Sequence, residues 1–173
     1  MAAAEKGVLH MGTEIERKFL PKSDAWRKKK SYVHHIRQGY LARTGGNTTR
    51  VRISKIGKRN RAMLCIKGPA TPQGVVPEYE YQIPVADAEE LLQLCNGDII
   101  EKKRHHIWYK GLLFEVDEFL GNLEGHIMVE VELSVVGQHI SLPKWVGKEV
   151  TRDRRYANTR LSIKGWPVNT AAT

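Results

Sequence analysis

Charged and apolar residues alternate along the chain, and the clearest example lies close to the N-terminus. In an extended conformation, Glu14, Glu16 and Lys18 point to one face, while Ile15 and Phe19 point to the other. A period of two residues is typical of a β-strand with one polar and one apolar face. This segment is therefore predicted to be a strand whose charged face meets either water or a polar interior.

The same alternation recurs in most of the chain, for example where Arg50 and Arg52 flank Val51. Charged residues stand two positions apart in four further pairs, namely Glu78 and Glu80, Lys102 and Arg104, Glu115 and Asp117, and Glu130 and Glu132. Glycine-containing turns or loops separate most of the segments, as at residues 45–47 and 57–60. The pattern predicts eight strands, over residues 13–20, 34–43, 49–53, 62–67, 78–84, 99–109, 112–119 and 127–136.

Charges of both signs at this regularity exceed what solubility requires. A sheet closed into a barrel explains them, because its interior face is polar while helices cover its apolar exterior. One helix is expected from Asp87 to Gly97, and a basic helix is expected to open at Thr151 and run through Arg160. The predicted fold class is therefore α+β, an eight-stranded antiparallel β-barrel, or tunnel, with a charged lumen and helices packed outside.

The 173 residues, 41% of them hydrophobic and 27% charged, are typical of one globular domain. We expect residues 1–12 to be a disordered lead, 13–164 a single tunnel domain and 165–173 a loose tail. No apolar run reaches the roughly 18 residues that a membrane span needs, so no membrane partner is expected. The cysteines Cys65 and Cys95 match no metal-site spacing and are interpreted as reduced and buried, which favours a cytoplasmic location.

The net charge of +9 suits nucleic acid, a membrane surface or a small polyanion. Nucleic-acid binding would require the run at residues 28–30 and the run at residues 152–155 to form one exposed stripe. No nucleic acid is expected as a partner, because the regular placement of charge favours a small molecule inside the barrel.

The inward face, assigned from the alternation, carries more acids than bases. The acids are Glu14, Glu16, Glu78, Glu80, Glu115, Asp117, Glu130 and Glu132, and the bases are Lys18, Arg50, Arg52, Lys67, Lys102 and Arg104. Crowded carboxylates need compensating cations, and their hard oxygens suit magnesium, manganese or calcium. Arginine and lysine beside such a metal suit a phosphate chain. The alternative is a barrel laced with salt bridges that binds no ligand, which is a costly use of buried charge.

Two other kinds of site find little support. The sequence has no Gly-x-x-x-x-Gly-Lys loop, so no P-loop is present. The adjacent pairs His34-His35 and His105-His106 would face opposite sides of a strand and make poor metal ligands.

The segment Glu14-Ile15-Glu16-Arg17-Lys18 resembles the Glu-x-Glu-x-Lys signature of the CYTH superfamily, the triphosphate tunnel metalloenzymes. The resemblance extends over residues 13–160 and is closest to the short, single-domain bacterial members. The motifs that follow in order are Arg50-x-Arg52, Lys67, Glu78-x-Glu80, Lys102-x-Arg104, Glu115-x-Asp117 and Glu130-x-Glu132. The family has an eight-stranded tunnel that binds triphosphates with divalent metal. Its members include inorganic triphosphatases, thiamine triphosphatases, class IV adenylyl cyclases and RNA triphosphatases.

The resemblance implies a role for each inward residue. The metal ligands would be Glu14, Glu16 and Glu132, with Glu130 adjacent. The phosphates would be held by Lys18, Arg50, Arg52, Lys67, Lys102 and Arg104. Catalysis would depend on Glu14, Glu16 and Lys18, while Glu78, Glu80 and Asp117 would order water or a second metal. Arg155, on the C-terminal helix, would plug one mouth of the tunnel and touch substrate.

The expected function is hydrolysis of tripolyphosphate to pyrophosphate and phosphate with Mg²⁺ or Mn²⁺ as cofactor. Alternatives are a class IV adenylyl cyclase or an organic triphosphatase acting on thiamine triphosphate or ATP. Aromatic rings that could bind a base are Trp26, Tyr40 and Trp145. A non-catalytic sensor of polyphosphate or nucleotide is an alternative of another class. The oligomeric state stays open, with a homodimer as one option.

Overall fold

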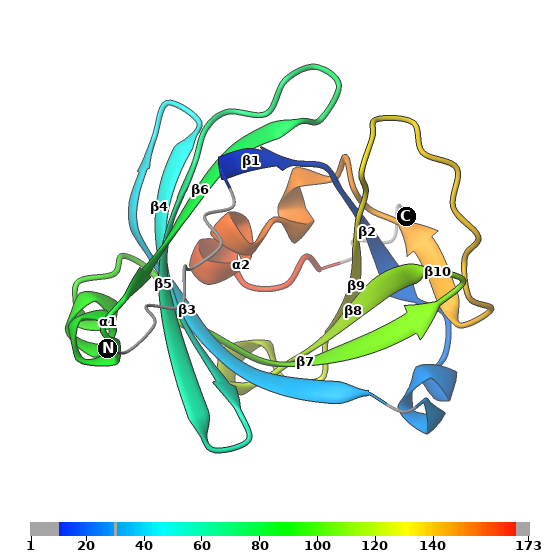
Figure 1. Ribbon diagram of the computed structural model, residues 1–173, viewed down its shortest axis with the longest axis horizontal. Coiled ribbons are helices and arrows are strands. Elements are labelled where there is room, and N and C mark those ends of the chain that lie inside the picture. The colour runs from blue at the N-terminus through cyan, green and yellow to red at the C-terminus, as the bar shows by residue number, and fades with distance from the viewer. Residues whose placement is uncertain (1–10, 30, 169–173) are drawn as a thin grey trace, which may run out of the picture.

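The fold is built on one antiparallel sheet of ten strands, ordered β1-β6-β5-β4-β3-β7-β8-β9-β2-β10. The computed structural model describes residues 11–29 and 31–168, and Figure 1 shows the sheet curling into a ring. The strands are β1 (Met11–Glu14), β2 (Glu16–Pro21), β3 (Tyr32–Thr44), β4 (Asn47–Ile56), β5 (Arg59–Lys67), β6 (Val76–Ile83), β7 (Ile100–Tyr109), β8 (Leu112–Phe119), β9 (Ile127–Glu132) and β10 (Val146–Glu149). The helices are η1 (Asp24–Lys28), α1 (Val85–Gln93), η2 (Gly121–Leu123), η3 (Arg154–Tyr156) and α2 (Asn158–Lys164).

The predicted first strand is two strands, and this changes how the ring is completed. β1 pairs with β6, whereas β2 pairs with β9 on one side and with β10 on the other. Ile15 joins β1 to β2 covalently, but the two do not pair, so the hydrogen-bond ladder stays open at this place. The sheet therefore has ten strands and an open hydrogen-bond ladder, and not the expected eight strands in a closed barrel. The reason is that the predicted first strand pairs with β6 through β1 and with β9 through β2, so the chain must leave the first pairing before it enters the second.

The predicted antiparallel connections are confirmed at the hairpin between β3 and β4. Gly45 and Gly46 both have positive φ angles, of 58° and 85°, and Thr44 pairs with Asn47. A two-residue turn with positive φ at both positions matches the right-handed twist of the strands it joins, and glycine reaches this conformation without strain. The turn therefore fixes the register of β3 against β4 from Ala42 to Thr44, and an irregularity between Tyr40 and Ala42 shifts the register by one residue beyond that.

The helix α1 covers the outside of the sheet, as expected. Its residues Ala88 and Leu92 are buried in a cluster with Val51, Ile53 and Ala62 from β4 and β5. A second apolar cluster covers the outer face of β8 and β9 and contains Trp26 and Trp145. The outward apolar residues of the alternation are thus removed from water, which is the main favourable term in forming this layer.

The helix α2 does not lie outside, which corrects the expectation for the C-terminal helix. Leu161 is buried with Ile100, Phe119 and Met128, which share the inner face of the sheet with Lys102 by strand register. Figure 1 accordingly shows α2 within the outline of the ring. The helix therefore fills one end of the curled sheet.

A glycine lets α2 approach so closely. Gly97 has φ of +84°, and a Cβ atom built there would lie 2.6 Å from the backbone oxygen of Ser162. Next to it, the amide of Asp98 donates to the same oxygen at 2.7 Å. Arg43 of β3 adds a donation from Nη2 to the hydroxyl of Ser162 at 2.6 Å. These contacts fix α2 against the segment that follows α1.

The expected basic helix from residue 151 to 160 is interrupted. Arg154–Tyr156 forms the short helix η3, and Ala157 then adopts an extended conformation before α2 begins. In the predicted tail, Trp166 stacks on His126 with ring centroids 4.4 Å apart. Trp166 is therefore packed, whereas Val168 is exposed. Residues 1–10 and 169–173 lie outside the described residues, and β1 begins at Met11. None of the described helices is long and apolar enough to cross a bilayer.

Candidate active site

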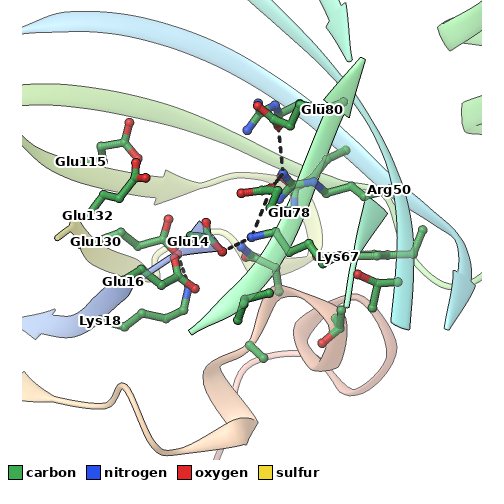
Figure 2. Close-up of a pocket in the computed structure, with 18 of the residues that line it drawn as sticks. Glu14, Glu16, Lys18, Arg50, Lys67, Glu78, Glu80, Glu115, Glu130 and Glu132 are labelled. Atoms are coloured by element: carbon green, nitrogen blue, oxygen red, sulfur yellow. Dashed lines mark hydrogen bonds and ion pairs between the residues drawn. The ribbon is translucent and has the colours of Figure 1, made fainter. Parts of the chain in front are cut away.

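A cavity of about 460 Å³ occupies the inside of the curled sheet, and we call it the central cavity. Figure 2 shows carboxylates and cationic side chains from several strands converging on it. Its charged lining consists of Glu14, Glu16, Lys18, Arg50, Arg52, Lys67, Glu78, Glu80, Lys102, Arg104, Glu115, Glu130 and Glu132. All the predicted site residues except Asp117 and Arg155 therefore share one cavity.

One side of the cavity is formed by β4, β5 and β6 with Glu14 of β1, and we call it the arginine wall. Arg52 Nη2 lies 2.8 Å from Glu80 Oε1, and Arg50 Nη2 lies 3.4 Å from Glu78 Oε1. Lys67 bonds to Glu14 and lies 3.3 Å from Glu78. Each cation of this wall thus has a carboxylate partner, and the wall contains three of each.

The facing side is formed by β2, β7, β8 and β9, and we call it the carboxylate wall. Lys18 Nζ lies 2.6 Å from Glu130 and 2.8 Å from Glu16. Arg104 bonds to Glu115 and lies 2.5 Å from Glu130. Lys102 is the third cation of this wall. Because Glu132 also faces the cavity, carboxylates outnumber cations on this wall.

Burial and charge shift the pKa values of the carboxylate wall in opposite directions. Burial alone would raise the pKa of Glu130, but Lys18 and Arg104 more than offset this, so the pKa lies well below its ordinary value of 4.5. For Glu115, burial prevails over Arg104 and raises the pKa. Burial alone would lower the pKa of Lys18, yet Glu130 and Glu16 raise it. Glu130 is therefore the ionised counter-ion of Lys18 and Arg104, whereas Glu115 keeps its proton up to a higher pH than an ordinary glutamate does.

Asp117 lies behind the cavity lining and is fully buried. Its carboxylate accepts from Lys102 Nζ at 2.5 Å and from Arg104 Nε at 2.7 Å. The placement corrects the expectation that Asp117 orders water or a second metal in the lumen. It positions two cations instead, since it holds them at the cavity surface from behind.

Arg155 is also absent from the cavity lining. Its side chain is exposed and bonds to Asp153, with Nη2 2.7 Å from Oδ2. The C-terminal residues that do line the cavity are Ala157, Asn158 and Thr159, at the start of α2. The start of α2 therefore reaches the cavity, whereas Arg155 does not line it.

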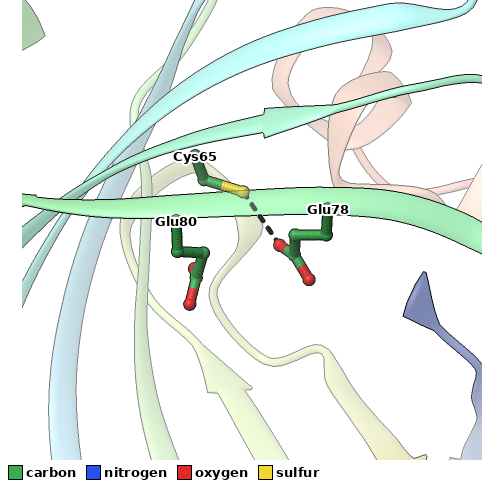
Figure 3. A group of neighbouring side chains, drawn as sticks. All are labelled: Cys65, Glu78 and Glu80. Atoms are coloured by element: carbon green, nitrogen blue, oxygen red, sulfur yellow. Dashed lines mark hydrogen bonds between the residues drawn. The ribbon is translucent and has the colours of Figure 1, made fainter. Parts of the chain in front are cut away.

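Cys65 is buried, as expected, but it belongs to the inner face and not to an apolar core. It pairs in register with Glu80, and its thiol donates to Glu78 Oε1 at 2.8 Å (Figure 3). Candidate ligand atoms of these three residues lie within 4.8 Å of one another. Burial raises the pKa of the Cys65 thiol to about 12, so it stays protonated at neutral pH and is a poor metal ligand.

The chain is similar to known proteins over most of its length. The sequence matches the CYTH domain family over residues 12–162. It is 40% identical over 152 residues to an inorganic triphosphatase of Acetivibrio thermocellus, spanning 87% of this chain and 94% of that protein. It is 36% identical over 154 residues to an inorganic triphosphatase of Nitrosomonas europaea, spanning 87% and 97%.

The chain belongs to the CYTH family. A solved crystal structure of an inorganic triphosphatase superposes on this CYTH protein with a TM-score of 0.64 and 34% identity, covering 91% of this chain and 99% of the other. The resemblance seen in the motifs is thus confirmed over most of the chain.

The inner face of this CYTH protein also contains residues that the charge pattern does not single out. Gln38 and Tyr40 of β3 line the cavity, as do Asn158 and Thr159 of α2. The alternation does hold the signal for β3, because Gln38 and Tyr40 lie two residues apart and face Arg52 and Arg50 in register. The two residues of α2 have no such signal, since a tertiary contact brings them to the cavity.

Proposed function

We propose that this protein is a divalent-metal-dependent inorganic triphosphatase that hydrolyses tripolyphosphate to pyrophosphate and phosphate. The observation that carries the proposal is the convergence of six cationic side chains and seven carboxylates on one cavity. Two relatives that are 36% and 40% identical are inorganic triphosphatases, which supports the same activity here.

The carboxylates of the cavity fit a hard divalent ion. A smaller cavity of about 90 Å³ is lined by Glu14, Glu78, Glu80 and Glu132 with Gly12 and Thr13, and no lysine or arginine lines it. Oxygen ligands without histidine suit Mg²⁺ or Mn²⁺. Following the family resemblance, we assign the ion to Glu14, Glu16 and Glu132, of which Glu14 and Glu132 line this smaller cavity. Glu130 is less suited than the sequence indicates, because Lys18 and Arg104 already engage both of its oxygens.

The phosphate chain binds to the cations of both walls. Guanidinium groups of Arg50, Arg52 and Arg104 donate to phosphate oxygens in pairs, and the lysines contribute point charges. Asp117 fixes the direction of Arg104 and Lys102, so these donors are oriented before substrate arrives. A bound divalent ion supplies positive charge to the phosphate oxygens and favours ionisation of a water molecule.

Carboxylates that substrate displaces from their cations become available for the attacking water. Glu78 and Glu80 lie on the arginine wall beside the cations that take the phosphates. Once those cationic side chains bind phosphate in place of the carboxylates, Glu78 and Glu80 can accept hydrogen bonds from water and align it with a terminal phosphorus. Lys18, two residues after the proposed metal ligand Glu16 on β2, holds the opposite end of the phosphate chain.

The aromatic residues favour an inorganic substrate over a nucleotide or thiamine triphosphate. Trp26 and Trp145 are buried in the apolar cluster outside the sheet, so neither can stack on a base. Tyr40 lines the cavity but is itself 4% exposed. A class IV cyclase or an organic triphosphatase needs a site for the organic group, and these three rings do not form one.

A phosphate-release assay with Mg²⁺ tests the proposal, using tripolyphosphate, ATP, thiamine triphosphate and pyrophosphate. The kcat/KM should be highest for tripolyphosphate, lower for the two organic triphosphates, and lowest for pyrophosphate, which meets only a subset of the cations. Cyclic AMP as the main product from ATP would establish a cyclase instead. Binding of tripolyphosphate without release of phosphate on any substrate would establish a sensor. Size-exclusion chromatography with light scattering tests whether the protein is a monomer or a homodimer.

A further inference from the structure

Gln38 stands out on the inner face because it is polar, neutral and almost completely buried. It lies on β3, lines the central cavity and is 1% exposed. Its register partners are Arg52 on β4 and Ile100 on β7. Its Nε2 has no hydrogen-bond partner among the described residues. A buried donor without a partner destabilises a fold, so its retention needs an explanation.

Two neighbouring cations show the same property. Arg50 Nε and Arg52 Nε are also buried and without a hydrogen-bond partner in the part of the chain that the structure describes. Gln38 faces Arg52, and Arg50 lies two residues further along β4. The three donors thus have almost no accessible surface, have no acceptor among the described residues, and belong to adjacent residues of the inner face. A ligand rich in acceptor oxygens, such as a phosphate chain, would satisfy all three.

We propose that Gln38 is a substrate-binding residue whose amide Nε2 donates to a phosphate oxygen beside Arg50 and Arg52. This inference rests on the proposed function and adds a contact that charge alone does not reveal. Because the amide is neutral, it provides a directed hydrogen bond without changing the charge balance between cations, carboxylates and metal. Its burial excludes water, which strengthens a hydrogen bond to a charged oxygen.

The substitution Gln38→Met tests this role, since methionine is similar in length and volume but has no donor. A hydrogen bond to a charged group accounts for roughly a tenfold to hundredfold change in kcat/KM, so we expect a loss of that size on tripolyphosphate with Mg²⁺. The unfolding temperature of the ligand-free variant should equal or exceed that of the wild type, because an unsatisfied buried donor is removed. Gln38→Glu should lose more activity, since it adds a negative charge next to the phosphates.

Gln82→Met is the matched control. Gln82 also lies on a strand, in β6, but it is exposed, so its replacement should leave kcat/KM unchanged. Wild-type kcat/KM in Gln38→Met, together with a lower unfolding temperature, would show that Gln38 is a structural residue and overturn the inference.

Ligand-induced thermal stabilisation separates this inference from the proposed function. Tripolyphosphate with Mg²⁺ should raise the unfolding temperature of the wild type more than that of Gln38→Met. Equal shifts in the two proteins would contradict the role of Gln38. A wild type that is stabilised but releases no phosphate would overturn the proposed hydrolysis, and the difference between the two shifts would still report on Gln38. A wild type that is neither stabilised nor active would overturn both.

Discussion

The arginine wall and the carboxylate wall of the central cavity have equal numbers of cations but different numbers of carboxylates. On the arginine wall, Arg50, Arg52 and Lys67 face Glu14, Glu78 and Glu80. On the carboxylate wall, Lys18, Lys102 and Arg104 face Glu16, Glu115, Glu130 and Glu132, with Asp117 behind them. One wall is therefore balanced, and the other has a surplus of negative charge.

The difference explains why substrate and metal would bind together. A polyanion that binds the cations must displace carboxylates, and these then need another positive charge. A divalent ion held by the proposed ligands Glu14, Glu16 and Glu132 would supply it. By linkage, each ligand would then strengthen the binding of the other.

Removal of the metal should have the largest effect. With excess chelator, phosphate release from tripolyphosphate should stop, because the surplus carboxylates of the carboxylate wall repel the substrate. Mg²⁺ or Mn²⁺ should restore it, whereas Ca²⁺ should restore little, since its looser coordination places water less accurately. Steady-state phosphate release checks this. Full activity in excess chelator would show that hydrolysis needs no divalent metal and would contradict the proposed metal dependence.

Glu16→Gln tests the carboxylate wall, and Glu78→Gln tests the arginine wall with the same chemical change. Glu16→Gln should lower kcat/KM by orders of magnitude, because it removes a metal-ligand charge at nearly constant volume. Glu78→Gln should cost less, since that carboxylate is one of a balanced set. Kinetics with tripolyphosphate at saturating Mg²⁺ provide the measurement, and Glu90→Gln on the exposed face of α1 is the control. A larger loss in Glu78→Gln would reverse the assignment of the walls.

Glu130→Gln should mainly lower stability. It would remove one carboxylate partner from each of Lys18 and Arg104. Lys18 keeps Glu16, and Arg104 keeps Glu115 and Asp117, so the loss of unfolding free energy at neutral pH should be smaller than the about 3–5 kcal/mol of a buried charge left without any partner. The folded-state pKa of Glu130 lies below 4.5, so its stabilising effect is present above that pH and is lost as the pH falls through the folded-state value. The gap between wild type and variant in urea unfolding should therefore narrow at acidic pH. A gap that does not change with pH would contradict the role as counter-ion.

Arg52→Ala should remove one bidentate phosphate contact from the arginine wall. Charge-assisted bonds of this kind contribute about 1.5–3 kcal/mol, which corresponds to roughly a tenfold to hundredfold fall in kcat/KM. Arg52→Lys should recover part of it, because a point charge does not replace the planar fork. Arg61→Ala, at an exposed position of β5, is the control. Complete rescue by lysine would indicate that only charge matters on this wall.

Arg155→Ala should have the smallest effect, because Arg155 bonds to Asp153 outside the cavity. Its kcat/KM on tripolyphosphate should match that of the wild type. A tenfold loss would mean that η3 moves towards the cavity when substrate binds, and that the sequence-based role of Arg155 is correct after all.

Much of the candidate site could be predicted from the sequence, because side chains alternate strictly in a strand. Once Glu16 is assigned to the inner face, Lys18 must lie there too, and the same reasoning applies to Arg50 with Arg52 and to Glu130 with Glu132. The CYTH resemblance adds the order of these motifs along the chain. The composition of the cavity is therefore a local property of the chain.

The partners and depths of these side chains depend on the tertiary structure. Asp117 has the same parity as Glu115, yet it lies behind the lining because Lys102 and Arg104 cover it. The change of ladder at Ile15 and the entry of α2 into the ring depend on contacts between segments distant in sequence. Periodicity specifies the face of a strand to which a residue points. Only the packed fold determines which opposite charges meet, which donors stay unpartnered, and where the surplus of carboxylates lies.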